Sequence, residues 1–81
     1  MSRDEIFQRL DQVFQDVFDD ETITVNEATT AADIAPWDSM EHINLMLAVE
    51  MEFGVKFTIG ESTNLHNVGE LADIIAARAT K

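Results

Sequence analysis

Apolar side chains near the start of the chain recur every three or four positions, and this spacing constrains the fold more than any other feature. The members of this set are Ile6, Phe7, Leu10, Val13, Phe14, Val17 and Phe18. The spacing predicts an amphipathic helix over roughly residues 3–18, whose apolar face must be buried against other elements. Ser2 and Glu5 form a capping-box pattern that would start this helix.

A second helix is predicted from residue 39 to about Phe53. Asp38 is the expected N-cap, with Glu41 three residues further on. Pro36 disfavours an earlier start, and Gly54 is typical of the position just after a helix. The expected inner side is broad and has polar interruptions; it comprises Met40, Ile43, Met46, Leu47, Val49, Glu50 and Phe53.

The remaining segments predict one more main helix and a short one. Asn67 and Glu70 would start the last helix, which continues towards Arg78 and Lys81. Its expected inner face comprises Val68, Leu71, Ile74 and Ile75. Residues 60–65 would form one brief helical turn. The connector before that turn is expected to point three side chains inward: Val55, Phe57 and Ile59.

Residues 19–37 form a long connection in which we expect Ile34 to reach the core. A short strand around Ile23 and Val25 is conceivable, but no other segment could pair with it convincingly. The fold prediction is therefore all-α: one domain over residues 1–81, built as a small four-helix bundle. Three helices are long, one is short, and the long loop joins the first two.

Charge and composition exclude several functions. The formal net charge is −11, and no Lys or Arg lies between Arg9 and Lys56. Binding to nucleic acid or to anionic membranes needs the opposite sign, whereas basic protein partners are favoured. The chain has no cysteine, and no apolar run approaches the roughly 20 residues that span a membrane. We expect a cytoplasmic, monomeric protein without a metal site or membrane insertion.

Ser39 is the residue with the greatest chemical interest, because it lies where an acidic cap meets an apolar helix. A serine nucleophile needs a base within hydrogen-bond reach, an orienting acid and a pocket. His42 is close in sequence, but we expect it to face solvent, and Trp37 to pack on His42 or Ile43. A small hydrolase using Ser39 and His42 is therefore a disfavoured alternative, and we predict no catalytic residues.

The second predicted helix, together with the residues just before and after it, resembles the acyl carrier protein family. The residues that carry the likeness are Asp38-Ser39-Met40, Ile43, Leu45-Met46-Leu47, Val49-Glu50 and Glu52-Phe53-Gly54-Val55. The family has an Asp-Ser-Leu motif at the start of its second helix, and the likeness in layout covers essentially the whole chain. Met40 departs from the motif Leu, while Asn44 and Met51 occupy positions where charged residues are common.

The resemblance implies that Ser39 carries a 4′-phosphopantetheine arm, with Asp38 and Met40 completing the motif. A phosphopantetheinyl transferase would attach this arm, whose thiol then carries acyl groups as thioesters in fatty acid, polyketide or related biosynthesis. The positions implied to meet basic patches on acyl-loading and acyl-accepting enzymes are Glu41, Leu47, Glu50 and Glu52. Two alternatives stay open: a D-alanyl, aminoacyl or peptidyl carrier, and an unmodified acidic helical interaction module.

Overall fold

The computed structural model describes residues 1–79 and contains four α-helices and one 3₁₀ turn. The main helices are α1 (Arg3–Phe18), α2 (Ser39–Phe53) and α4 (Val68–Arg78). The short elements are η1 (Ala31–Asp33) and α3 (Ile59–Thr63). No strand occurs in the part of the chain that is described, so the all-α prediction is confirmed.

The predicted caps set the helix boundaries. The side chains of Ser2, Asp38 and Asn67 each accept a hydrogen bond from the backbone N–H three residues further on, at 2.9–3.1 Å. Gly54 ends α2 in the left-handed conformation, with φ 65°. Thr58 and Glu61 form a full capping box at the start of α3, whose five residues confirm the brief helical turn expected within residues 60–65 and begin one residue earlier.

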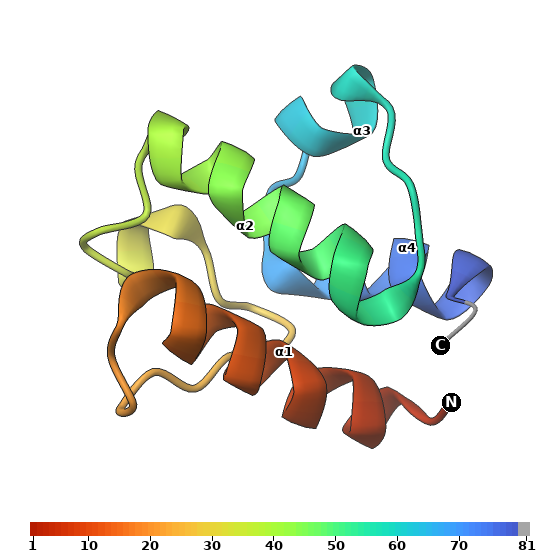
Figure 1. Ribbon diagram of the computed structural model, residues 1–81, viewed down its shortest axis with the longest axis horizontal. Coiled ribbons are helices and arrows are strands. Elements are labelled where there is room, and N and C mark those ends of the chain that lie inside the picture. Colours follow the sequence, from red (N-terminus) through yellow and green to blue (C-terminus); the bar gives the residue numbers. More distant parts are fainter. Residues whose placement is uncertain (80–81) are drawn as a thin grey trace.

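The core lies where α1 packs against both α2 and α4 (Figure 1). Its largest fully buried side chains are Phe14, Phe53, Ile6, Leu10, Leu45, Leu71, Ile75, Val49 and Val68. The predicted inner face of α1 is confirmed at four of its positions, and Phe7, Val17 and Phe18 are half-buried. Ile34 reaches the core from the long loop, as expected.

Four residues that were expected to point inward are exposed instead. On α2, Met40, Ile43 and Leu47 are exposed, while Leu45 takes their place in the core. Because apolar side chains occur on nearly every side of α2, periodicity alone could not select the inner one. Ile59 is also exposed, since it is the first residue of α3 rather than part of an extended connector. Lys81 lies outside the described residues.

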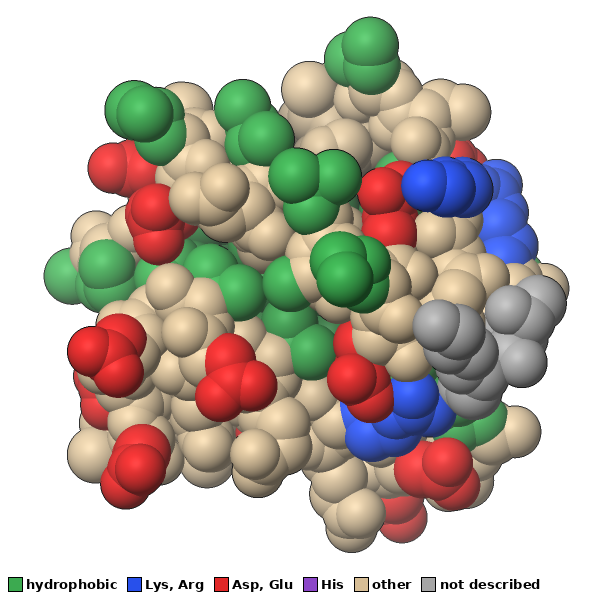
Figure 2. Space-filling view, in the orientation of Figure 1, with side chains coloured by type: hydrophobic (Ala, Val, Ile, Leu, Met, Phe, Trp, Pro, Cys, Tyr) green, Lys and Arg blue, Asp and Glu red, His purple; other side chains and the backbone are tan. Residues whose placement is uncertain are grey.

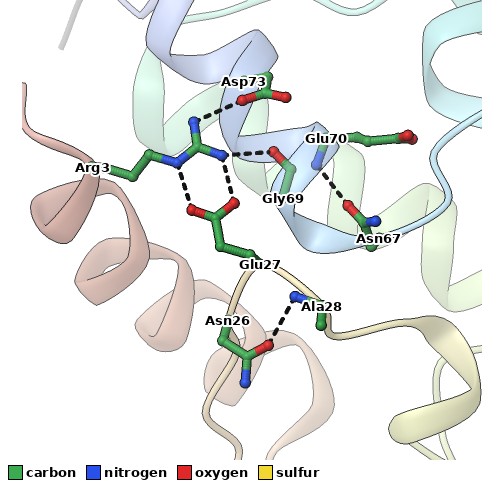
Figure 3. A network of polar contacts seen from close by, with 8 residues as sticks. All are labelled: Arg3, Asn26, Glu27, Ala28, Asn67, Gly69, Glu70 and Asp73. Atoms are coloured by element: carbon green, nitrogen blue, oxygen red, sulfur yellow. Dashed lines mark hydrogen bonds and ion pairs between the residues drawn. The ribbon is translucent and has the colours of Figure 1, made fainter.

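The middle of the long loop is fixed to the start of α4. The N–H groups of Val68 and Gly69 donate to the carbonyl oxygens of Thr29 and Glu27, at 2.8 and 3.0 Å. Arg3 joins α1 to the same point through a two-bond pair with Glu27 and a bond to the Gly69 carbonyl (Figure 3). These contacts satisfy N–H groups that a helix start otherwise leaves without partners.

An ion pair links α3 to the end of α4 and predicts a pH effect. Arg78, together with the Thr58 backbone N–H, lowers the pKa of Glu61 from its ordinary value of 4.5 to about 2. A lowered folded-state pKa stabilises the protein fully above the unfolded-state value, and this contribution disappears as pH falls towards 2. We expect Glu61→Gln to lower the melting temperature slightly at pH 6, with the difference vanishing near pH 2. Thermal scans across this range check it; a pH-independent difference would contradict it.

Candidate attachment site

The segment before Ser39 is shaped by short-range hydrogen bonds. The Trp37 N–H donates to the Ile34 carbonyl and the Asp38 N–H to the Pro36 carbonyl, both at 3.0 Å. Asp38 has extended backbone angles, and its carboxylate accepts from the Glu41 N–H at 2.9 Å. This capping geometry makes Ser39 the first residue of α2.

Ser39 and both of its neighbours in the motif are exposed. The Met40 side chain keeps 77% of its accessible surface, and Asp38 points its carboxylate back onto the helix start. A hydroxyl at the first helical position is rigidly held yet within reach of another protein. The same position lies at the positive end of the helix, where backbone N–H groups stabilise a bound phosphate.

His42 joins three parts of the structure. Its ring stacks on Trp37, with centroids 5.9 Å apart and planes at 17°. The Trp37 Nε1–H donates to His42 Nδ1 at 3.0 Å, and His42 Nε2 lies 2.7 Å from the Ser62 carbonyl oxygen of α3. The expected Trp37 packing is confirmed, whereas the solvent-facing placement of His42 is wrong: the residue is half-buried.

The same bonds determine what His42 can do chemically. Nδ1 must be unprotonated to accept from Trp37, so the neutral ring carries its proton on Nε2 and donates it to Ser62. Neither nitrogen is then available to deprotonate Ser39, which disfavours the hydrolase alternative. Among residues 1–79, no group of His, Asp and Glu side chains could hold a metal ion.

A cavity of about 1060 Å³ opens beside Ser39, between α2, α3 and the end of the long loop. Its α2 wall carries Ser39, His42, Met46 and Glu50. Phe57 and Leu65, both half-buried, belong to its apolar lining outside α2. Sequence reasoning missed this cavity, because its walls come from segments separated by about twenty residues along the chain.

The α2 carboxylates expected to meet partners are partly engaged within the chain. Glu50 accepts from the Phe57 N–H at 2.8 Å, and Glu52 pairs with Arg9 at 2.8 Å. Glu41 is half-buried and accepts from the Asn44 side chain at 3.2 Å. Leu47 is the fourth position that was expected to meet partners. It is apolar, and 55% of its surface is exposed.

Leu47 belongs to an exposed apolar stripe along α2. Its members are Met40, Ile43, Leu47 and Met51. Figure 2 shows hydrophobic side chains in a row along α2 with carboxylates nearby. The sequence contains this spacing of three, four and four residues, but it does not distinguish the exposed stripe from the buried side of α2, because both are apolar.

No family model matches this chain. Its curated relatives include two that match almost its full length. The acyl carrier protein of Coprothermobacter proteolyticus is 31% identical over 78 residues, covering 93% of this chain and 92% of the relative. That of Acidothermus cellulolyticus is 30% identical over 76 residues, covering 94% and 90%. The chain belongs to the acyl carrier protein family.

The fold of this acyl carrier protein agrees with that assignment. It is similar to the solution structure of a holo acyl carrier protein from Geobacter metallireducens, with a TM-score of 0.83 and 40% identity. The match covers 89% of this chain and 83% of the other. The protein is a non-catalytic carrier, and its family implies a 4′-phosphopantetheine group, as the resemblance predicted.

The described residues of the acyl carrier protein fit such a group. An exposed hydroxyl starts α2, and a cavity with apolar lining begins beside it. The chain contains no cysteine, so a thiol must come from an attached group. None of the helices in residues 1–79 is long and apolar enough to cross a membrane.

Proposed function

We propose that Ser39 is the attachment point of the 4′-phosphopantetheine group, on which the protein carries acyl intermediates as thioesters. The observation that supports this most is the exposed position of Ser39 at the first residue of α2, beside the cavity. The bond would be a phosphodiester to the Ser39 hydroxyl oxygen. The bound group supplies the thiol that this chain lacks.

Ser39 is the best suited of the three serines. The hydroxyl of Ser2 caps α1 by accepting from the Glu5 N–H at 3.1 Å. Ser62 is half-buried, with its hydroxyl 3.4 Å from His42 Nε2. A phosphate on Ser39 would instead lie at the exposed start of α2, a helix of 15 residues, where the helix dipole favours an anion.

The chain orients Ser39 but provides no base for its modification. Asp38 is committed to capping α2, and both nitrogens of His42 are bonded. A phosphopantetheinyl transferase must therefore supply the base that deprotonates the hydroxyl, together with a magnesium ion. The carrier contributes a fixed hydroxyl and a recognisable surface around it.

Enzymes that act at Ser39 must cover the neighbouring surface of α2. The apolar stripe begins one residue after Ser39, so Met40 and Leu47 are proposed contacts. Glu41, Glu50 and Glu52 stay predicted contacts for basic docking patches. The net charge of −11 would attract such patches over distance.

We propose the type of pathway from residues near the attachment site. Trp37 beside the attachment site, with Asn44 and Met51 on α2, favours a carrier that serves a dedicated polyketide, peptide or modified-lipid pathway over housekeeping fatty acid synthesis. An aminoacyl or peptidyl carrier is the alternative. We propose one domain over residues 1–81 that acts as a soluble cytoplasmic monomer.

Thiol counting tests this function without interference, because the unmodified chain contains no cysteine. We expect the purified apo protein to titrate with no thiol, and to gain one per chain after incubation with coenzyme A and a broad-specificity transferase. The new thiol should accept acyl groups that hydroxylamine then removes. An unchanged count with an active transferase would favour the unmodified interaction module.

A further inference from the structure

The four methionines of the chain differ in how far solvent reaches them. Met40 and Met51 keep 77% and 76% of their accessible surface and Met1 keeps 50%, whereas Met46 keeps 6%. The chain has no cysteine, so these thioethers are its only sulfur atoms before a group is attached. A dissolved oxidant therefore reaches three of the sulfur side chains, while the packing of the core protects the fourth.

Met40 is the exposed methionine beside the attachment site. It follows Ser39 directly, and it is the first member of the apolar stripe on α2. An enzyme that reaches the Ser39 hydroxyl must therefore cover Met40 as well. Met51 comes twelve residues after Ser39, roughly 18 Å along the helix axis. Met1 is at the N-terminus, which lies near the opposite end of α2 (Figure 1).

Oxidation would change the character of the surface at Met40. The unbranched methionine side chain is apolar and adaptable, so it packs well against an apolar surface of a partner. Its sulfoxide carries a polar S–O group, and burying that group without a hydrogen bond is unfavourable. Leucine, which the family motif has at this position, contains no sulfur and does not undergo this reaction.

We propose that Met40 is an oxidation site whose sulfoxide blocks attachment at Ser39. A peroxide supplies the oxygen: the Met40 sulfur donates a lone pair to one peroxide oxygen, the O–O bond breaks and an S–O bond forms. The sulfur is oxidised by two electrons and the peroxide is reduced; with hydrogen peroxide, the second oxygen leaves as water. Methionine sulfoxide reductases reverse the change with electrons from a thiol reductant. This inference rests on the proposed attachment at Ser39.

The fold would tolerate this modification. The Met40 side chain lies outside the core, so an added oxygen there meets water and displaces no packed group. Met46 belongs to the core, and its oxidation would disrupt the packing between the helices. Because Met46 is shielded, a limited dose of peroxide changes the surface beside Ser39 and leaves the bundle folded.

Timed oxidation of the full-length apo protein tests the first step. Hydrogen peroxide is removed with catalase after increasing times, and peptide mapping by mass spectrometry measures the added oxygen on each methionine. We expect Met40 and Met51 to be oxidised about tenfold faster or more than Met46. Far-UV circular dichroism identifies the samples that stay folded. A Met40 that reacts no faster than Met46 would overturn the proposal, whatever the loading reaction shows.

The loading reaction tests the second step. A folded sample with oxidised Met40 and intact Met46 is incubated with coenzyme A and a broad-specificity phosphopantetheinyl transferase, and kcat/KM is measured with the carrier as the varied substrate. We expect kcat/KM to be about tenfold lower than for the untreated protein. Treatment with both epimer-specific sulfoxide reductases and dithiothreitol should restore it.

Two variants assign the effect to one sulfur atom. Met40→Leu should give the same kcat/KM before and after peroxide, whereas Met51→Leu should lose as much as the wild type. An unchanged wild-type value, or an equal loss in Met40→Leu, would overturn the proposal while leaving the attachment intact. An untreated wild-type chain that accepts no group would contradict the attachment itself, and with it the effect proposed for Met40.

Discussion

Replacing Phe14 by alanine is expected to leave the protein largely unfolded without any denaturant. Phe14 is fully buried and contacts Phe18 and Trp37, with ring centroids 5.9 and 5.3 Å away. It thereby joins α1 to the segment that leads into Ser39. Truncating a buried Phe typically costs about 3–5 kcal/mol. A chain of this size has a total stability of roughly that magnitude.

Urea titration followed by far-UV circular dichroism measures this effect. Phe14→Leu is the matched control, because it keeps most of the buried volume and should cost under about 1.5 kcal/mol. If Phe14→Ala shifted the transition by no more than the leucine control does, the aromatic cluster around Trp37 would not be central to stability.

Gly69→Ala is expected to give the second-largest loss. A methyl group there would lie 2.7 Å from the Glu27 carbonyl oxygen and 2.8 Å from its carboxylate. The same carbonyl accepts from the Gly69 N–H, so the loop cannot retreat without losing that bond. We expect a cost of about 1–3 kcal/mol, through separation of the loop from α4.

Gly60→Ala provides the matched control for this substitution. A methyl group at Gly60 meets nothing within 4 Å, and alanine is the better helix former, by roughly 0.5–1 kcal/mol. Chemical denaturation of both variants should therefore give changes of opposite sign. A neutral Gly69→Ala would contradict the close approach of the loop to α4 at Glu27 (Figure 3). A destabilised Gly60→Ala would contradict the open space beside Gly60.

Local chemistry made the helix boundaries predictable. Asp38, Asn67 and Gly54 act within their own turn of helix, and the structure places them where the sequence indicated. The prediction of Ser39 as the first residue of α2 depended on such signals alone. The same holds for its exposure, since the side chain at that position projects from the helix end.

Contacts between distant segments were not predictable in this way. His42 lies twenty residues from Ser62, and no local pattern indicates that they meet. The contact between Gly69 and Glu27 likewise follows from where the loop lies. On α2, residues such as Leu45 and Leu47 are alike in polarity, and only packing against α1 decides which is buried. The cavity beside Ser39 is lined by both His42 and Ser62, so it was no more predictable than their contact.

Peptide mapping by tandem mass spectrometry tests the central proposal most directly. After reaction with coenzyme A and a transferase, the added mass should lie on Ser39 and on no other residue. Ser2→Ala and Ser62→Ala should each accept one group, and Ser39→Ala none. Modification of Ser39→Ala, or the group found on another residue of the wild-type chain, would contradict the account.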